Sequence, residues 1–331
     1  MTISLSRERL AQLLERAQGK RIVVIGDAML DVYLTGDVER ISPEAPVPVV
    51  RVRERKHALG GAANVAQNIL AIGCECTLVA AIGSDSGGET LRGMLAQKGG
   101  NTDALVGVGR STTQKTRIVA RSQQVVRIDE EEDEDLDGHE LERLLEVARE
   151  AIETADAVVL EDYNKGVLVP RVIRVTMDRA TARGTPVIVD PKYRNFFHYA
   201  GATIFKPNQR ELEAAIGASI SANDPAALSQ VVERLGVEHL LLTLGEHGMA
   251  LVGRAGETTR IPTVAREVYD VVGAGDTVSA YLAAMLAVGA RVDEAAVIAN
   301  LAAGIEVGKF GAASVSASEM LEYSDTHELY V

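Results

Sequence analysis

Tryptophan is absent from the chain, aromatic residues make up only 4% of it, and its 331 residues include just two cysteines. The scarcity of aromatic side chains argues against a base-stacking platform for single-stranded nucleic acid. Two cysteines, Cys74 and Cys76, are too few for a disulfide framework or a cysteine-based zinc site. We therefore expect both thiols to be reduced and buried in a cytoplasmic protein.

Long hydrophobic runs are also lacking. The longest apolar stretch, Thr277–Ala290, has 14 residues and suits a buried helix better than a membrane span. The first 21 residues are charged and have the period of an amphipathic helix, unlike a secretion signal. The sequence therefore predicts a protein without a membrane partner.

Basic residues are fewer than acidic ones, 34 against 47, which gives a net charge of −13. A nucleic-acid binder needs a basic stripe, and the sequence shows none. The segment Asp129–Glu140 contains nine acidic residues and neither lysine nor arginine, so it accounts for most of the imbalance. We expect this segment to be a solvated turn and the start of a helix.

Short runs rich in valine and isoleucine alternate with segments of helical period. The predicted strands are Arg21–Asp27, Thr77–Gly83, Asp156–Asp162, Pro186–Pro191, Ala202–Asn208 and His239–Gly245. The predicted helices include Ala62–Ile72, Glu89–Lys98, Glu140–Ile152, Val169–Arg183 and Ala226–Leu235. Nearly continuous apolar strands separated by helices predict an α/β fold, a doubly wound and mostly parallel sheet with helices on both faces.

Two segments, at about 31–52 and 112–128, alternate polar and apolar residues instead. They predict a small antiparallel sheet inserted into a single α/β domain that spans residues 1–331. Such strands could form a lid over a site, a surface for a homodimer, or both.

Polar residues cluster where five of the predicted strands end, which is the edge at which open α/β sheets bind ligands. Any one of them could be an ordinary loop charge. The residues are Asp27, Asp31, Glu161, Asp162, Asn164, Lys165, Asp190, Lys192, Arg194, Lys206, Asn208, Glu211, Thr243 and Gly245.

The sharpest motif is Asp270-Val-Val-Gly-Ala-Gly-Asp-Thr277, before the long apolar helix. Gly273 and Gly275 permit turns that a side chain would forbid. The N–H groups of the residues from Ala274 to Asp276 would then surround an anion, phosphate above all, at the helix N-terminus. Asp276 lies within this loop and could act as a general base. The alternative is a glycine-rich turn whose aspartate only caps the helix.

A second glycine pair, Gly60-Gly61, precedes Asn64 and opens another predicted helix. It would allow close approach of a ligand, or simply of the helix to the sheet. Neither the dinucleotide fingerprint nor the P-loop motif occurs in the sequence, which disfavours a nicotinamide-dependent oxidoreductase.

Together these motifs resemble the ribokinase (PfkB) family of carbohydrate kinases, in family order from about Arg21 to Ser316. The matching motifs are Gly26-Asp27 with Asp31, Gly60-Gly61 with Asn64, Asn208-x-x-Glu211, Thr243-x-Gly245-x-x-Gly248 and Gly273-Ala-Gly-Asp276. The resemblance implies a ribokinase-like fold and ATP-dependent phosphorylation of a sugar.

Within the family, three segments look like those of D-glycero-β-D-manno-heptose-7-phosphate kinases. They are Gly26–Pro48, Glu161–Gly166 and Asp190-Pro-Lys192. This implies transfer of phosphate to O1 of the heptose 7-phosphate, a step toward ADP-heptose and the lipopolysaccharide core. Many such kinases carry a C-terminal nucleotidyltransferase. Because this chain ends at Val331, we expect a separate adenylyltransferase, and a phosphatase, in the same pathway.

The resemblance also implies roles for particular residues. Asp276 would be the base, with Gly273, Ala274 and Gly275 forming the anion loop. Asp31, Gly60, Gly61 and Asn64 would bind the sugar, and Glu161 would belong to the substrate side. Asn208, Thr243, Gly245, Gly248 and Asn300 would line the nucleotide site. Glu211 would hold Mg²⁺ through water, and Asp270 is the candidate for a monovalent cation such as K⁺; beside it, Val-Val replaces the threonine-containing sequence of many members.

The phosphate that the sugar already carries requires cationic partners. The candidates are Arg40, Arg127, Lys165, Lys192 and Arg194, foremost Lys192 because it directly follows a strand. Two alternatives remain open: another sugar or nucleoside kinase of this family, and a sugar-phosphate sensor without activity.

Overall fold

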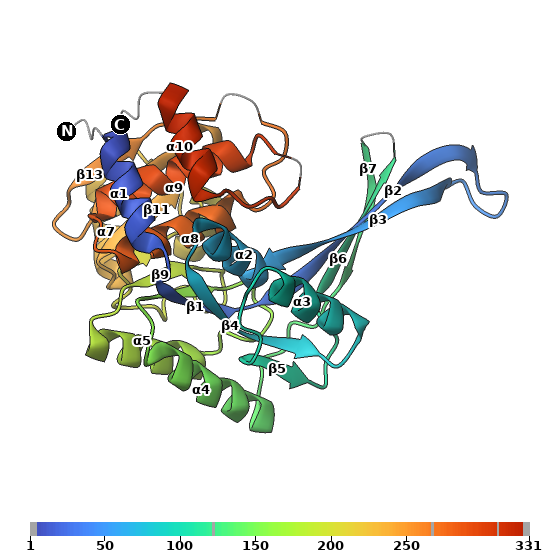
Figure 1. The fold of residues 1–331 in the computed structure, drawn as a ribbon, viewed down its shortest axis with the longest axis horizontal. Coiled ribbons are helices and arrows are strands. Elements are labelled where there is room, and N and C mark those ends of the chain that lie inside the picture. The colour runs from blue at the N-terminus through green and yellow to red at the C-terminus, as the bar shows by residue number, and fades with distance from the viewer. Residues whose placement is uncertain (1–4, 121–122, 266–267, 310, 327–331) are drawn as a thin grey trace.

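A computed structural model describes residues 5–120, 123–265, 268–309 and 311–326. Its main sheet has nine strands in the order β13-β12-β11-β10-β9-β8-β1-β4-β5 (Figure 1). The pairs from β5 to β11 are parallel, and β12 and β13 add an antiparallel edge. The strands are β1 (Arg21–Gly26), β4 (Glu75–Gly83), β5 (Leu105–Val108), β8 (Ala157–Glu161), β9 (Val187–Asp190), β10 (Ile204–Phe205), β11 (His239–Thr243), β12 (Met249–Gly253) and β13 (Thr258–Ile261).

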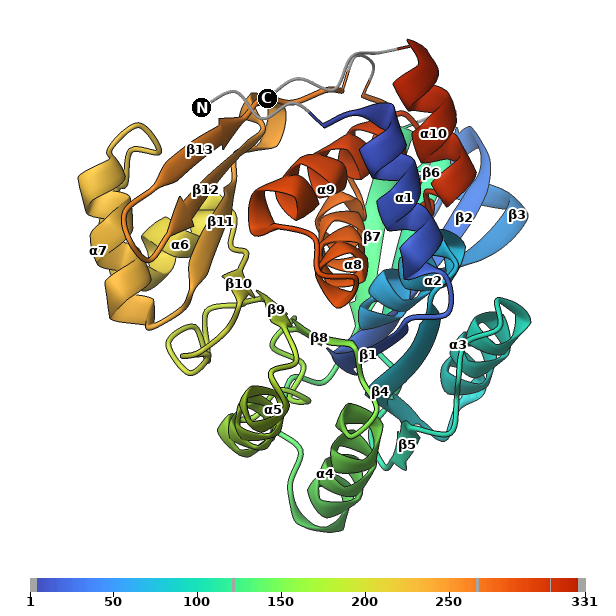
Figure 2. The ribbon, with the colours of Figure 1, turned by 60° about the vertical axis from the view of Figure 1, so that its left-hand side comes forward.

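Helices cover both faces of this sheet (Figure 2). One face packs against α1 (Arg7–Ala17), α2 (Ala62–Ile72), α3 (Ser86–Gln97), α8 (Ala274–Ala287), α9 (Val292–Glu306) and α10 (Ala317–Thr326). The other packs against α4 (Gly138–Ile152), α5 (Pro170–Arg183), α6 (Gln209–Ile216) and α7 (Pro225–Leu235). The predicted doubly wound α/β fold is therefore confirmed.

Strand β8 shows why the apolar runs are continuous. Ala157 and Val159 belong to the core on one face, whereas Val158 and Leu160 belong to the core on the other. Side chains of a strand alternate between faces, so a strand covered on both sides must be apolar at every position.

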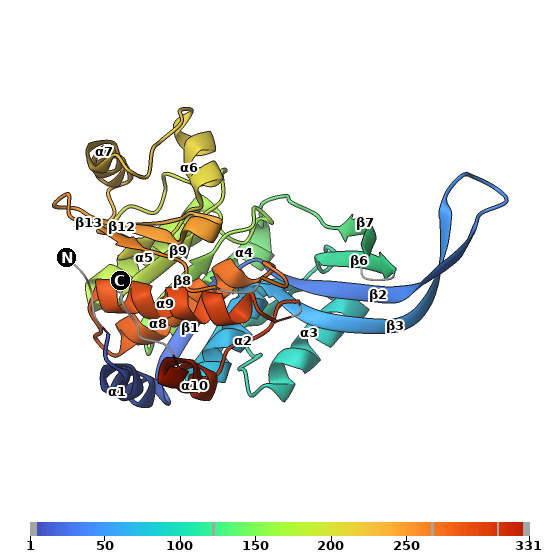
Figure 3. The same ribbon diagram turned by 90° about the horizontal axis from the view of Figure 1, so that it is seen from above.

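A second, four-stranded sheet has the order β3-β2-β6-β7 and projects from the body (Figures 1 and 3). It consists of β2 (Ala28–Ile41), β3 (Pro48–Gly61), β6 (Gln114–Ala120) and β7 (Gln123–Glu130). The predicted small antiparallel sheet is confirmed for the two hairpins, whereas β2 and β6 pair in parallel. The first hairpin is longer than predicted at both ends. Residues 121 and 122 of the second predicted segment lie outside the described residues.

Several predicted boundaries shift in the structure. Helix α8 begins at Ala274 rather than Thr277, so the anion loop is already its first turn. The acidic segment starts within β7 and ends in α4, with an exposed loop between them. Cys74 and Cys76 are buried and free, as expected. Among the described helices, none combines the length and the apolar character that a bilayer span requires.

Candidate active site

The candidate site lies where β1, β8 and β9 end and α8 begins. Gly273 precedes the helix with φ = +99°, a left-handed conformation that favours glycine. A Cβ atom on Gly273 would lie 2.8 Å from Nδ2 of Asn64. The glycine therefore allows the α8 N-terminus to approach Asn64 on α2.

Asp276, in the first turn of α8, is almost completely buried. Asn64 donates from Nδ2 to Oδ2 of Asp276 at 2.6 Å, and the Tyr163 hydroxyl donates to Oδ1 at 2.9 Å. Burial raises the pKa of Asp276 to about 6, against the opposing effect of these two hydrogen bonds. A carboxylate with a pKa near neutrality is suited to general base catalysis.

Three buried carboxylates meet beside this base. Glu161, Asp190 and Asp276 each place an oxygen within 4.8 Å of the others. The Lys206 ammonium compensates Asp190 through a buried ion pair of 2.6 Å. Neither oxygen of Glu161 accepts a hydrogen bond of normal geometry from a described residue. Burial, reinforced by Asp190 and Asp276, raises the pKa of Glu161 well above its usual value.

Oxygen ligands of this kind suit Mg²⁺, and the uncompensated Glu161 fits such an ion. A bound cation would oppose this shift and favour the ionised form of Glu161. Glu161, which was predicted on the substrate side, lies buried in this carboxylate cluster beside Asp276.

The loop after β8 is fixed by the buried carboxylate of Asp27. It accepts backbone N–H groups from Tyr163 at 2.8 Å, Lys165 at 3.0 Å and Val167 at 3.1 Å. These three hydrogen bonds determine where Tyr163 and Lys165 lie. Because Asp27 is buried, it contributes to the site by holding this loop in position.

The predicted sugar-side residues come together above this loop. Asp31 is buried and forms an ion pair with Arg117 of the neighbouring strand β6. A Cβ on Gly60 would lie 2.7 Å from Oδ2 of Asp31, and one on Gly61 would lie 2.5 Å from the carbonyl oxygen of Asp27. Both positions require glycine because backbone and carboxylate approach so closely.

Two of the predicted phosphate-binding cations lie at the site. Nζ of Lys192 is 5.1 Å from the Tyr163 ring centroid and forms an ion pair with Glu211. Lys165 forms an ion pair with Glu131 at 2.8 Å.

The other three cations lie farther out. Arg194 pairs with Asp133, and the exposed Arg127 pairs with Asp129. Arg40 is exposed near the far end of β2, about 30 Å from Asp31 by the rise per residue of a strand. The structure therefore does not bring Arg40 to the site of its own chain.

The predicted nucleotide-side residues lie around the ends of β10 and β11. Asn208 and Glu211 form a reciprocal capping box at the start of α6, and Asn208 bridges to Thr243. The two carboxylate oxygens of Glu211 receive hydrogen bonds from the Asn208 backbone and Lys192, so the first contacts of Glu211 are with protein groups. Gly245 opens a short turn that ends at Gly248.

Gly248 and Asn300, two further predicted nucleotide-side residues, contact the backbone at the end of β13. Gly248 has φ = +79°, and a Cβ there would lie 2.0 Å from the carbonyl oxygen of Ile261. Asn300, on α9, donates to the carbonyl of Pro262 at 2.8 Å.

The candidate cation residue Asp270 accepts a hydrogen bond from the Val272 backbone at 3.0 Å. Beyond it lies Glu306, a buried carboxylate that sequence reasoning missed. Burial raises its pKa to about 8, against the opposing effects of the Ala313 backbone N–H and of Lys309. The signal was a single acid within the apolar run Leu301–Val307.

Sequence reasoning also gave no role to Tyr163, Lys115 or Arg117. Tyr163 stands in a quoted motif, but nothing in the sequence shows that its hydroxyl reaches Asp276. Lys115 and Arg117 alternate along β6 and point to the face that carries Asp31 and Tyr33. Because they are two residues apart on a strand, the sequence indicated that both side chains lie on the same face of the sheet.

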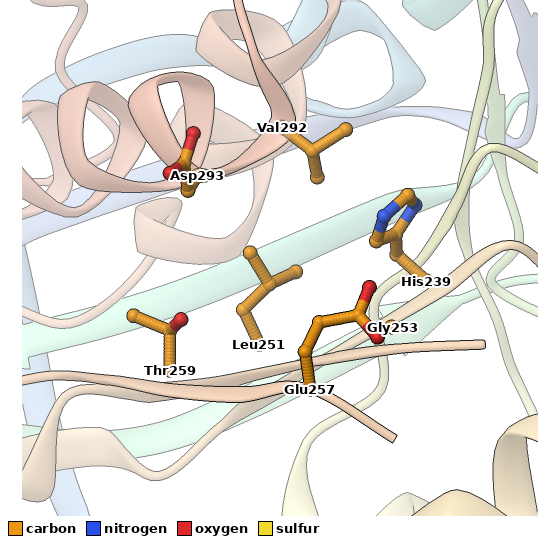
Figure 4. Close-up of a pocket in the computed structure, with 7 residues that line it drawn as sticks. All are labelled: His239, Leu251, Gly253, Glu257, Thr259, Val292 and Asp293. Carbon is orange, nitrogen blue, oxygen red and sulfur yellow. The ribbon is translucent and has the colours of Figure 1, made fainter. Parts of the chain in front are cut away.

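A separate cavity of about 270 Å³ lies near the opposite edge of the sheet, where β11 begins (Figure 4). Two acids on its wall make it a poor site for a phosphate. Its lining residues are His239, Leu251, Gly253, Glu257, Thr259, Val292 and Asp293.

Comparison with known proteins agrees with this geometry. Residues 20–319 match the pfkB family carbohydrate kinases. The chain is 46% identical over 316 residues to the bifunctional protein HldE of Rhodospirillum rubrum, covering 94% of this chain and 64% of that protein. It thus spans less than two thirds of the length of this relative.

Solved structures share the fold. Phosphofructokinase-2 from Escherichia coli in complex with potassium has a TM-score of 0.75 at 19% identity, covering 93% of this chain and 99% of that one. Arabidopsis thaliana ribokinase complexed with ribose and ATP has a TM-score of 0.71 at 21% identity, covering 92% and 98%. The chain belongs to the pfkB family of carbohydrate kinases, as its motifs predicted, and it is a phosphotransferase that acts on an alcohol group of a sugar.

Proposed function

We propose that this kinase transfers the γ-phosphoryl group of ATP to O1 of D-glycero-β-D-manno-heptose 7-phosphate, forming the 1,7-bisphosphate. One observation supports kinase chemistry above the others: a buried carboxylate, Asp276, lies at the N-terminus of α8 and is held by two hydrogen-bond donors. The heptose as substrate rests on the resemblance of the segments around Asp27, Glu161 and Asp190.

In this proposal Asp276 accepts the proton of the sugar hydroxyl as that oxygen attacks phosphorus. The N–H groups of Ala274, Gly275 and Asp276, in the first turn of α8, would stabilise the charge on the transferring phosphoryl group. For Ala274 this would replace a long hydrogen bond, 3.5 Å, to the carbonyl of Val271. Phosphoryl transfer depends mainly on positioning and electrostatics, which is what a preorganised loop supplies.

Mg²⁺, when bound with ATP, would neutralise charge on the phosphates. The carboxylates of Glu161 and Asp190, which lie close together, would hold it, and Glu211 would reach it through water after releasing Lys192. Asp31, Asn64 and the glycine pair would bind sugar hydroxyls. Thr243, Gly245, Gly248 and Asn300 would surround the nucleotide, and Asp270 would hold a monovalent cation such as K⁺.

The projecting sheet would cover the sugar and exclude water, which protects ATP from hydrolysis. Its outer strands would also pair across a homodimer. We further propose one domain over residues 1–331, a cytoplasmic location, and a pathway in which an adenylyltransferase activity and a phosphatase act on the product for lipopolysaccharide synthesis.

The test is ATP-dependent release of ADP with a panel of heptose 7-phosphate, fructose 6-phosphate, ribose and adenosine. The proposal expects selective turnover of the heptose phosphate. Preference for another acceptor would instead identify a different kinase of this family. Ligand binding without turnover of any acceptor would favour a sensor, which the intact Asp276 argues against.

A further inference from the structure

A lysine on the small sheet faces the active site and forms no ion pair with a carboxylate of the described residues. Lys115 lies on β6, opposite Asp31 of β2 in the strand register. Its side chain is partly buried, and among the described residues it forms no ion pair, whereas Lys165, Lys192, Lys206 and Arg117 all do.

The surroundings of Lys115 are unfavourable for its charge. Burial lowers the pKa of Lys115, and the positive charge of Lys165 acts in the same direction, against Glu131 and Asp129. Glu131, Asp129 and Asp31 offset this only in part, and a partly buried ammonium group that forms no ion pair with a described residue would gain from an anionic ligand. Lys165 lies close enough to Lys115 to affect its pKa, so one anion beside both side chains would interact with two positive charges.

The position of Lys115 relative to the base gives the second argument. Its Nζ is 5.8 Å from the centroid of the Tyr163 ring, and the hydroxyl of the same ring contacts Asp276 at 2.9 Å. Lys115 and the base are therefore separated by about the length of one tyrosine side chain. A sugar that presents a hydroxyl to Asp276 would extend its far end toward Lys115.

We infer that Lys115 binds the phosphate group that the sugar substrate already carries, with Lys165 beside it. This inference rests on the proposed function, because it requires a phosphorylated acceptor. It assigns the discrimination between a sugar phosphate and its parent sugar to β6, so the small sheet recognises the substrate as well as covering it.

The test compares Lys115→Met, which keeps most of the aliphatic stem, with Lys115→Arg, which keeps the charge. In Lys115→Met, KM for the sugar phosphate should rise about 10- to 100-fold with a much smaller change in kcat, because a charge-assisted contact is lost. Lys115→Arg should recover most of this loss. Lys56→Met is the matched control: Lys56 lies on β3 of the same sheet and is 64% exposed.

A second readout does not depend on turnover. Inorganic phosphate should bind the wild-type protein in calorimetry and should bind Lys115→Met at least tenfold more weakly, with Lys56→Met unchanged. Equal phosphate affinity and equal KM in wild type and Lys115→Met would overturn the inference while leaving the kinase proposal intact. If no sugar phosphate is turned over, the proposed function fails, but the phosphate titration still decides the role of Lys115. In that case, a wild-type protein that binds no phosphate would contradict the inference about Lys115.

Discussion

The hydroxyl of Tyr163 donates a 2.9 Å hydrogen bond to Oδ1 of Asp276, which joins the loop after β8 to the first turn of α8. The bond favours the ionised carboxylate and so opposes the burial that raises the pKa of Asp276 to about 6. A base must be deprotonated to act, so kcat/KM should fall about tenfold per pH unit below pH 6.

Tyr163→Phe removes this donor and should move the acidic limb of the kcat/KM profile to higher pH. Turnover well above pH 7 should fall less than turnover at pH 6, because the remaining carboxylate is ionised there. The measurement is the pH dependence of ADP release for both proteins. An acidic limb at the same pH in Tyr163→Phe would contradict a role for this hydrogen bond.

Gly273→Ala should lower kcat by roughly tenfold or more, in line with the effect of misplacing a reacting group. The new Cβ would lie 2.8 Å from Nδ2 of Asn64, and φ = +99° is strained for alanine. Gly289→Ala is the control: Gly289 also has positive φ, +72°, but a Cβ there meets nothing within 4 Å. If both variants retain the same kcat, or lose the same fraction of it, the close approach at Gly273 has no catalytic role.

Glu306 should make the protein less stable as the pH rises. Its folded pKa of about 8 lies above the ordinary value of 4.5, so between these pH values the folded state binds the proton that the unfolded state has lost. The contribution of Glu306 to the free energy of unfolding should then fall by at most about 1.4 kcal/mol per pH unit.

Glu306→Gln removes this titration. Chemical denaturation of the cation-free protein at pH 5.5 and pH 8 should show a smaller loss of stability in the variant than in wild type. Asp276 and Asp162, whose pKa values are both raised to about 6, titrate in both proteins and so cancel in the comparison. An equal loss in the two proteins would show that Glu306 is ionised in the fold.

The small sheet exposes Ile41 at the end of β2, Val52 on β3, and Val126 and Ile128 on β7, each more than 40% accessible. We expect these side chains to pack in a homodimer. Sedimentation at micromolar concentration should show a dimer for wild type and a monomer for the double variant Val126→Asp, Ile128→Asp. A wild-type monomer across the accessible concentrations would contradict the prediction.

Much of the fold could be predicted because each strand of a doubly covered sheet must be apolar throughout, as β8 is. Strands β5, β12 and β13 lie at the edges of the sheet and were not predicted, nor were helices α6, α9 and α10. Helices α6 and α10 are short, and α9 is buried at most positions and so lacks an amphipathic pattern. The glycine loop before Asp276 could be predicted because Gly273 and Gly275, which permit a tight turn, directly precede an aspartate in the sequence.

The contacts between distant segments could not be predicted. The Tyr163–Asp276 hydrogen bond joins residues 113 positions apart, and Asp31 meets Arg117 across 86 positions. Only the pairing of β2 with β6 places Arg117 and Lys115 over the site. Charge type alone drew attention to Arg40, because the sequence does not reveal how far it lies along its strand.

The most direct test of the account is phosphorus NMR of the product that wild type and Asp276→Asn form from heptose 7-phosphate and ATP. Wild type should yield a second sugar phosphate attached at O1. Asp276→Asn should lose about 100- to 10,000-fold in rate, the range of general base catalysis, while calorimetry shows that it still binds the sugar phosphate. Phosphorylation at another position, or an undiminished rate in Asp276→Asn, would contradict the account.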